Sequence, residues 1–282
     1  MLAIRAAWRA AAERLEAVSS SAKLDAQVLL TDVLGADNRA YLLTYPEKPL
    51  TEAQGAEYER AIARRATGEP VAYIRGYKDW YDRRILVTPD VLIPRPETEL
   101  LLEAALERVG EQPGAAVADI CTGSGAIAVT LAAHAPQATV YATDLSAAAL
   151  EVARRNAQAA AVSVDFRQGD LLAPLMGDGV RLDVLVSNPP YIATDELQRL
   201  AVARHEPSLA LDGGADGLDL VRDLLSAAPV VLRPGALVLV EIGAEQGEAV
   251  LGLAQQYLQP QEVRIVPDYA GLDRFLWARL PG

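Results

Sequence analysis

The feature that most constrains the fold is a regular alternation of apolar, strand-like runs with helical patterns after residue 115. The five strand-like runs are residues 115–120, 138–143, 162–167, 182–187 and 235–242. Helical patterns separate them at residues 124–134, 146–160 and 216–232. Such alternation predicts an α/β domain with a parallel sheet and helices on both faces. Ligands on such sheets bind beyond the carboxyl ends of the strands, so the loops that follow the strands should surround one crevice.

The end of the chain departs from this alternation. A helical pattern at about residues 246–257 precedes two strand-like segments, residues 262–267 and 273–279. Because these two segments are close in sequence, we expect them to pair as an antiparallel hairpin at the edge of the sheet.

The first seventy residues predict a compact helical bundle instead. Apolar residues recur at helical spacing along two faces, Ile4, Trp8, Ala11, Leu15 and Val18 on the first and Leu24, Val28, Leu29, Val33 and Leu34 on the second. We expect Gly35 to end the second helix. Thr51 and Gln54 fit a capping box for a further helix that Gly68 would stop. Since the bundle carries no cluster of catalytic residue types, its role is packing or the recognition of a partner.

Residues 71–95 are expected to form a β-hairpin that links the two parts of the chain. Three β-prone runs support this interpretation, Val71–Ile74, Trp80–Tyr81 and Ile85–Val87. Pro94 and Pro96 then flank Arg95, and Pro96 with Glu97–Glu99 suits the first turn of a helix. Glu97 and Glu99 either favour that helix start or line a site.

Composition narrows the functional classes. With 26 basic and 38 acidic residues, the 282-residue chain has a formal net charge of −12, which is unfavourable for general attraction to nucleic-acid phosphates. One Cys and two His exclude an internal disulfide and make a zinc cluster unexpected, so we predict no metal and a reducing, cytoplasmic location. No apolar run reaches the ~18 residues of a membrane span, and the chain does not begin with an apolar signal core.

The loop after the first strand of the sheet is rich in glycine. It reads Asp119–Ala126, and its glycines would let the backbone pass close to a ligand at the start of the next helix. The spacing of a dinucleotide-binding fingerprint is not met, because neither Ile127 nor Ala128 is Gly. The loop indicates either an adenosine-containing cofactor or a tight strand-to-helix turn. Cys121 is interpreted as a small packed residue and not as a nucleophile, since no His lies nearby in sequence to activate it.

Acidic residues follow the second and third strands. Asp144 lies ~20 residues beyond the glycine-rich loop, where a carboxylate can accept hydrogen bonds from both ribose hydroxyls of either NAD or S-adenosylmethionine. Asp170 follows the third strand, where it either meets an adenine amino group or caps a turn.

The fourth strand ends in Asn188-Pro189-Pro190-Tyr191. Because prolines fix φ and donate no N–H, this turn should be rigid. The Asn188 side-chain oxygen and the Pro189 carbonyl can accept the two hydrogens of a planar NH2 group, on which Tyr191 packs. The arrangement suits methyl transfer to an amide or an aromatic amine by orientation, with no covalent enzyme intermediate. The alternative is a proline-rich loop that merely ends a strand.

Together these residues resemble class I S-adenosylmethionine-dependent methyltransferases that modify planar nitrogens. Within that group, nearly the whole chain is similar to the release-factor glutamine-N5 methyltransferases (the PrmC/HemK family), including Leu24–Ala26, Gly68–Pro70, Val91–Glu99 and Glu206–Leu211. The resemblance implies a Rossmann-like, mostly parallel sheet with an antiparallel C-terminal edge hairpin, plus the small N-terminal bundle. The expected domains are residues 1–70 for the bundle, 71–95 for the linker and 96–282 for the methyltransferase.

The resemblance also implies S-adenosylmethionine as cofactor, S-adenosylhomocysteine as product, and the Gln of the Gly-Gly-Gln loop in bacterial release factors as substrate. It implies cofactor contacts from Cys121, Thr122, Gly123, Ser124, Gly125, Asp144, Asp170, Leu171 and Asn188. It implies substrate contacts from Asn188, Pro189, Pro190 and Tyr191, of which Asn188, Pro189 and Tyr191 are the catalytic set. Cys121 stands where Gly is common in the family, and Leu171 where some relatives have an aromatic residue. The bundle would contact the body of the release factor.

Two other functions are compatible with parts of the sequence. A nucleic-acid adenine-N6 methyltransferase would use the same clamp, residues Asn188–Tyr191, on a flipped base. The acidic charge and the lack of a long basic insertion argue against this function. A non-catalytic binding module is disfavoured by the intact cofactor loop and the complete clamp. His134 and His205 are interpreted as surface or structural residues. The alternative for His205 is a substrate role, because it precedes Glu206-Pro207 in a loop, residues 193–216, that can close over the site.

Overall fold

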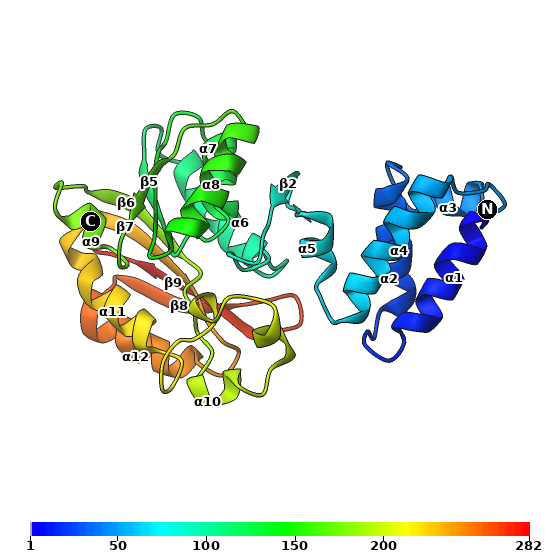
Figure 1. Ribbon diagram of the computed structural model, residues 1–282. Helices are drawn as coiled ribbons and strands as arrows, with labels where there is room; N and C mark the ends of the chain where they lie inside the picture. The colour runs from blue at the N-terminus through cyan, green and yellow to red at the C-terminus, as the bar shows by residue number, and fades with distance from the viewer. Residues whose placement is uncertain (1) are drawn as a thin grey trace. The chain divides into compact units, whose positions relative to one another are not determined.

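The computed structural model describes residues 2–282, which divide into two compact units, the first ending at Tyr77 and the second beginning at Lys78 (Figure 1). Residue 1, where the predicted bundle begins, lies outside the described residues. No helix within residues 2–282 combines the length and the apolar character needed to cross a membrane.

The first unit is helical, as the sequence predicts. Its helices are α1 (Ile4–Leu15), α2 (Ala22–Val33), α3 (Ala40–Thr44), α4 (Glu52–Ala66) and α5 (Val71–Arg75). The apolar stripes of α1, α2 and α4 pack into one core that includes Trp8, Leu15, Leu29, Leu30 and Ile62. The predicted capping box is present, because Thr51 Oγ1 accepts from Gln54 N while Gln54 Oε1 accepts from Thr51 N. Gly35 and Gly68 follow the ends of α2 and α4 with positive φ, as expected.

Two residues of the predicted apolar faces lie outside the core. Val18 is 43 % exposed, because α1 ends at Leu15 and the chain turns away before it. Leu24 is 42 % exposed, because the buried stripe of α2 runs through Ala22, Asp25 and Ala26 and leaves Leu24 on the opposite side. The charged residue Asp25 therefore lies on the buried face of α2, where apolar periodicity predicted only apolar residues.

The linker prediction is partly wrong. Val71–Ile74 belongs to the one-turn helix α5, in which the amides of Tyr73 and Ile74 donate to the Pro70 carbonyl. Local β-propensity is weak, and here packing of Val71 and Ile74 against the helical core outweighs it. A hairpin does follow, but it is shorter than predicted, with strands β1 (Tyr77–Trp80) and β2 (Arg83–Leu86).

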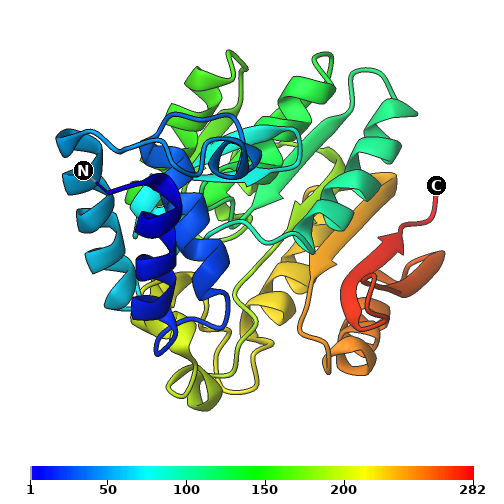
Figure 2. The same cartoon turned by 90° about the vertical axis from the view of Figure 1, so that its right-hand side faces the viewer.

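The second unit is built on a seven-stranded sheet of order β5-β4-β3-β6-β7-β9-β8. Its parallel strands are β3 (Ala116–Ile120), β4 (Thr139–Asp144), β5 (Asp165–Gln168), β6 (Leu182–Ser187) and β7 (Leu232–Glu241). The strands β8 (Glu262–Pro267) and β9 (Asp273–Arg279) pair antiparallel, and β9 also pairs antiparallel with β7. In Figure 2 these last strands, drawn in orange to red, lie at one edge of the sheet, which confirms the predicted edge hairpin.

Helices cover both faces of this sheet. Figure 1 shows α6 (Thr98–Gly110), α7 (Ala126–His134) and α8 (Ala147–Ala159) on one side, with α11 (Asp219–Ala227) and α12 (Gly247–Leu258) on the other. Shorter helices occupy the connections: α9 (Ala173–Met176), α10 (Thr194–Leu197) and the 3₁₀ turns Ala201–Arg204, Ser208–Ala210 and Ala228–Val230. The central strands β3 and β6 are buried along their whole length, as their continuous apolar runs predict.

The register of the sheet brings the predicted site loops to one edge. Ile120, the last residue of β3, lies opposite both Thr143 of β4 and Ser187 of β6. Ser187 in turn lies opposite Val240 of β7. The loops after residues 120, 144, 168, 187 and 241 therefore start from neighbouring positions, as the rule for parallel sheets requires.

Candidate active site

The glycine-rich loop between β3 and α7 is tightly folded. Cys121, Gly123 and Gly125 all have positive φ, of 60°, 54° and 78°. A Cβ at Gly125 would lie 2.9 Å from the Cβ of Ala153, so only glycine lets α7 approach α8 this closely. Gly123 instead has open space around the position of a Cβ. The loop thus offers its backbone to a ligand on one side while it packs two helices on the other.

Asp119 holds this loop from below. Its Oδ2 accepts hydrogen bonds from Thr122 Oγ1 at 2.6 Å and from Ala128 N at 3.1 Å. Its Oδ1 is buried and has no hydrogen-bond partner in the described chain. Burial raises the pKa of Asp119 to about 7, against the opposing effect of its two hydrogen bonds. An unpartnered buried carboxylate oxygen beside a pocket indicates a place for a donor or cation.

Asp144 fixes the next loop and faces the same space. Its Oδ2 accepts from Gly123 N and its Oδ1 from Ser146 N, both at 2.8 Å. Burial raises its pKa, while the backbone amides oppose that rise. Because each carboxylate oxygen can accept a second hydrogen bond, Asp144 retains acceptor capacity.

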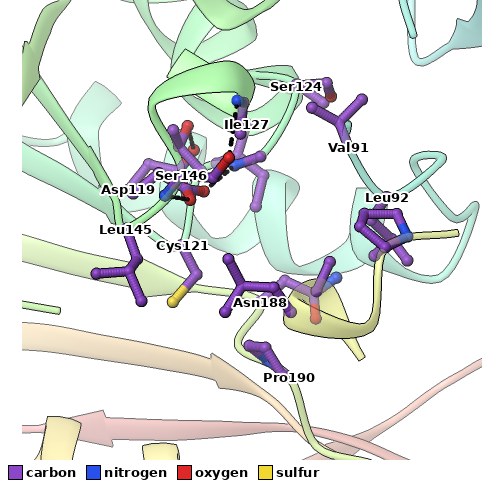
Figure 3. Close-up of a pocket in the computed structure, with 18 of the residues that line it drawn as sticks. Val91, Leu92, Asp119, Cys121, Ser124, Ile127, Leu145, Ser146, Asn188 and Pro190 are labelled. Carbon is purple, nitrogen blue, oxygen red and sulfur yellow. Dashed lines mark hydrogen bonds between the residues drawn. The ribbon is translucent and has the colours of Figure 1, made fainter. Parts of the chain in front are cut away.

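One pocket gathers most of the residues that the sequence predicted for a site (Figure 3). Its lining includes Cys121, Thr122, Gly123, Ser124, Asp144, Asp170, Leu171, Asn188 and Pro190. Gly125, Pro189 and Tyr191 are not in the lining. Figure 3 shows Asn188 and Pro190 reaching the pocket from the turn after β6, and Val91 and Leu92 from the segment before α6.

Cys121 lines the pocket as a neutral thiol. Burial is the main reason that its pKa lies well above the ordinary range, and the nearby Asp144 and Asp119 raise it further. A thiol of this kind is a poor nucleophile.

The turn at residues 188–191 is held rigidly from behind. Gln246 Nε2 donates to the Tyr191 carbonyl at 2.9 Å. A Cβ at Gly217 would lie only 2.4 Å from that same carbonyl oxygen, so glycine is required where the following loop crosses the turn. Pro189 and Pro190 are buried. Within residues 2–282, none of the hydrogen bonds of this turn ends on the Pro189 carbonyl, which remains able to accept one.

The side chains of the turn connect to a buried acid that sequence reasoning missed. Asn188 Nδ2 donates to Thr98 Oγ1 at 3.2 Å, and Thr98 Oγ1 donates to Glu241 Oε2 at 2.6 Å. Tyr191 OH donates to Glu241 Oε1 at 3.3 Å. Glu241 is 1 % exposed at the end of β7. The one available signal was its place at the carboxyl end of the last parallel strand.

The acidic residues flanking Thr98 stay outside the pocket. Glu97 is exposed, and Glu99 Oε1 accepts from Tyr81 N in the hairpin turn. Thr98 itself, between them, does line the pocket. Thus Thr98, which the sequence predicted only as part of a helix start, reaches the site.

The segment 193–216 forms one wall. Glu206 is buried, accepts from Ile93 N at 3.0 Å, and pairs with Arg95 at 2.6 Å. That anchor places Pro207, Leu209 and Ala210 in the pocket lining. His205 is not part of the lining, and His134 lies on the surface, 2.9 Å from Asp82. Among the described residues, no His, Cys, Asp and Glu side chains gather as a metal-binding cluster.

Comparison with known families finds two matches. Residues 6–76 match the family model described as the PrmC N-terminal domain, and residues 96–205 match the one described as the methyltransferase small domain.

Individual proteins similar to this chain have a consistent name. A release factor glutamine methyltransferase from Moorella thermoacetica is 48% identical over 255 residues, which cover 89% of each chain. The protein of the same name from Cereibacter sphaeroides is 46% identical over 280 residues, which cover 98% of each chain. Among solved structures, a methyltransferase from Pyrococcus furiosus matches with a TM-score of 0.51 and 20% identity, covering 82% of this chain and 100% of that one. This last likeness shows a shared fold.

Proposed function

This chain belongs to the release factor glutamine methyltransferase family, and we propose that it methylates the side-chain amide nitrogen, N5, of a glutamine in bacterial peptide chain release factors. The target glutamine is that of the Gly-Gly-Gln motif. The cofactor is S-adenosylmethionine, which supplies a methyl group on a positively charged sulfur.

The pocket fits this cofactor. Its open backbone at Gly123 and the acidic side chains Asp119 and Asp144 in its lining suit a ligand that carries cationic groups and hydroxyl donors. The orphaned Oδ1 of Asp119 supplies an acceptor that nothing in the described chain uses. We assign Asp144 to the ribose hydroxyls and Asp170 with Leu171 to the adenine.

The clamp would orient the target amide. An amide nitrogen is a poor nucleophile because its lone pair is delocalised into the carbonyl. Asn188 Oδ1 and the Pro189 carbonyl would each accept one N–H, which favours a pyramidal nitrogen with its lone pair directed at the methyl carbon. Tyr191 would pack near the flat group. The methylated nitrogen then releases a proton to solvent, so no strong base is needed.

The observation that carries the proposal is the orientation of Asn188. Its amide nitrogen donates to Thr98, which turns the side-chain oxygen away from Thr98 and leaves it to accept from a ligand. Together with the carbonyl of the rigid Pro189, this supplies two acceptors, which is what the two hydrogens of an NH2 group require.

The partner and location follow from the same reasoning. We assign the helical unit to the body of the release factor, because it contributes no residue to the pocket lining. Because its substrate takes part in translation, we propose a cytoplasmic location. The net charge of −12 disfavours stable nucleic-acid binding.

A methyl-transfer assay tests the proposal. The chain is incubated with tritiated S-adenosylmethionine and, separately, a release factor, its Gln→Glu variant in the Gly-Gly-Gln motif, DNA and tRNA. Label is expected on the unaltered release factor alone. Label on nucleic acid alone would establish the adenine-N6 alternative. Label on both release factors would move the target to another residue.

The cofactor assignment has its own test. Asp144→Ala should weaken binding of S-adenosylhomocysteine, measured by calorimetry, by about 10- to 100-fold, because a hydrogen bond to a charged group contributes roughly 1.5–3 kcal/mol. Unchanged affinity would remove Asp144 from the cofactor site.

A further inference from the structure

Behind the clamp lies a chain of hydrogen bonds that ends on a buried carboxylate. It runs from Asn188 Nδ2 to Thr98 Oγ1 and on to Glu241 Oε2, over 3.2 Å and 2.6 Å. The second carboxylate oxygen accepts from Tyr191 OH at 3.3 Å. Glu241 therefore contacts, directly or through one hydroxyl, both side chains of the clamp. The three elements involved are the start of α6, the turn after β6 and the end of β7.

The direction of these bonds follows from proton count. A carboxylate has no proton to give, so the hydroxyls of Thr98 and Tyr191 must both donate to Glu241. Once the Thr98 proton is used in this way, its oxygen presents only lone pairs to Asn188. The Asn188 carboxamide must then turn its NH2 group toward Thr98 and its oxygen away. A local side-chain flip of Asn188 would leave two acceptors facing each other.

We infer that Thr98 and Glu241 are positioning residues for methyl transfer, which act by holding the Asn188 carboxamide with its oxygen toward the substrate amide. This inference rests on the function proposed above. Neither residue needs to touch the substrate. Thr98 determines which face of the Asn188 amide points inward, and Glu241 determines which way the Thr98 hydroxyl points.

The charge on Glu241 matters to this arrangement. Burial is the main reason that its pKa is raised to about 7. The groups around it are Thr98 and Glu97 at the start of α6, Tyr191 after β6, and Arg274 on β9. The two hydroxyls and Arg274 lower the pKa, while Glu97 raises it. A protonated Glu241 can donate to Thr98, whose own proton then points at Asn188. The Asn188 oxygen would turn toward Thr98, and its NH2 group would face the NH2 group of the substrate.

A merely structural role makes different predictions. If Thr98 and Glu241 only joined α6 to the sheet, their loss would lower stability and cofactor affinity together. A positioning role lowers kcat, because Asn188 then spends part of its time in the unproductive orientation. The cofactor dissociation constant and the KM for release factor would change little.

The first test compares Thr98→Val with Thr98→Ser in the full chain. Valine has nearly the shape of threonine but neither accepts nor donates, whereas serine retains the hydroxyl. We expect kcat to fall at least 10-fold in Thr98→Val and to stay within about 3-fold in Thr98→Ser. S-adenosylhomocysteine affinity should change less than 3-fold in both. An unchanged kcat in Thr98→Val, or an equal loss in both variants, would overturn the inference.

The second test uses Glu241→Gln and does not depend on Thr98 tolerating substitution. At saturating cofactor and release factor, kcat of the unaltered chain should fall as pH is lowered through the pKa of Glu241. This acid limb should be absent in Glu241→Gln, which has no proton to gain. An identical acid limb in both chains would contradict the inference. In both tests the control is labelling of the release factor by the unaltered chain. If the unaltered chain gives no label, the proposed function fails, and this outcome is distinct from a failure of the positioning inference.

Discussion

The helical unit and the crevice of the sheet unit both bury carboxylates, but they surround them differently. In the helical unit, Asp25 accepts from the Ser19 and Ser21 hydroxyls at 2.7 and 2.9 Å and pairs with Arg65 at 2.8 Å. In the crevice, Asp119 and Glu241 accept hydrogen bonds from neutral groups, and within residues 2–282 neither lies within salt-bridge distance of a basic side chain, although Arg274 near Glu241 lowers its pKa.

The same contrast exists inside the sheet unit. Asp183 lies at the amino end of β6, far along the strand from the clamp, and it is matched by Arg233, Gln112 and the amide of Ala116. Asp25 and Asp183 are thus each paired with an arginine, whereas Asp119 and Glu241 have pKa values raised to about 7. Unneutralised acids are costly for stability and are concentrated at functional sites. The following measurements test this difference, beginning with the largest expected effect.

Removal of the clamp should impair activity and leave stability nearly intact. Asn188→Ala is expected to lower kcat by roughly 10²–10³-fold, since it deletes a group that orients the reacting nitrogen. Cofactor affinity should change far less. Steady-state labelling of release factor and calorimetry with S-adenosylhomocysteine measure the two quantities. Equal losses in both would show that Asn188 is mainly a cofactor contact.

Removal of Asp25, which is paired with Arg65, should lower stability and leave cofactor binding intact. Asp25→Ala leaves Arg65 without its carboxylate in a site where both side chains are mostly buried. We expect the free energy of unfolding of the helical unit to fall by about 3 kcal/mol, measured by urea denaturation. Cofactor binding should be unaffected. Asp37→Ala, at an exposed acid of the same unit, is the matched control and should change stability by less than about 0.5 kcal/mol.

Removal of a crevice charge should increase stability, and only at higher pH. The pKa of Glu241 rises from an ordinary 4.5 to about 7 on folding. Between these values the folded chain binds more protons than the unfolded chain, so stability falls as pH increases. Relative to the unaltered chain, Glu241→Gln should therefore gain about 3 kcal/mol between pH 4.5 and pH 8.

Thermal unfolding of both chains across this pH range measures the gain. Glu245→Gln, at an exposed neighbour, should show no such trend. If the difference in stability between Glu241→Gln and the unaltered chain were the same at every pH, the pKa of Glu241 would not be raised by folding. The contrast between the two regions would then fail.

The smallest effect concerns purely local chemistry in the helical unit. Thr51→Ala removes the side-chain acceptor of the α4 capping box and should lower stability by about 1 kcal/mol. Thr51→Ser keeps that acceptor and should be nearly neutral. A loss of similar size in Thr51→Ser would assign the effect to the Thr51 methyl group and not to the cap.

Local signals in the sequence predicted a large part of the fold. The strands 182–187, 262–267 and 273–279 match β6, β8 and β9 residue for residue, because apolar runs and turn residues specify them. Prediction failed where packing decided between weak preferences. Val71–Ile74 is helical despite its β-branched residues, and Asp25 sits on a buried helix stripe because Arg65, forty residues later, is there to meet it.

The sequence by itself determined the rigid turn at residues 188–191, because proline geometry and amide chemistry act within four residues. It also placed Asp144 and the glycine-rich loop at the carboxyl edge of a parallel sheet. Only the tertiary structure decided which way Asn188 faces. That depends on Thr98 and Glu241, which are separated by 143 positions in the chain and meet where the start of α6 packs against the end of β7. A proton's direction in a buried hydrogen bond is set by contacts in space, and such contacts leave no periodic trace in a sequence.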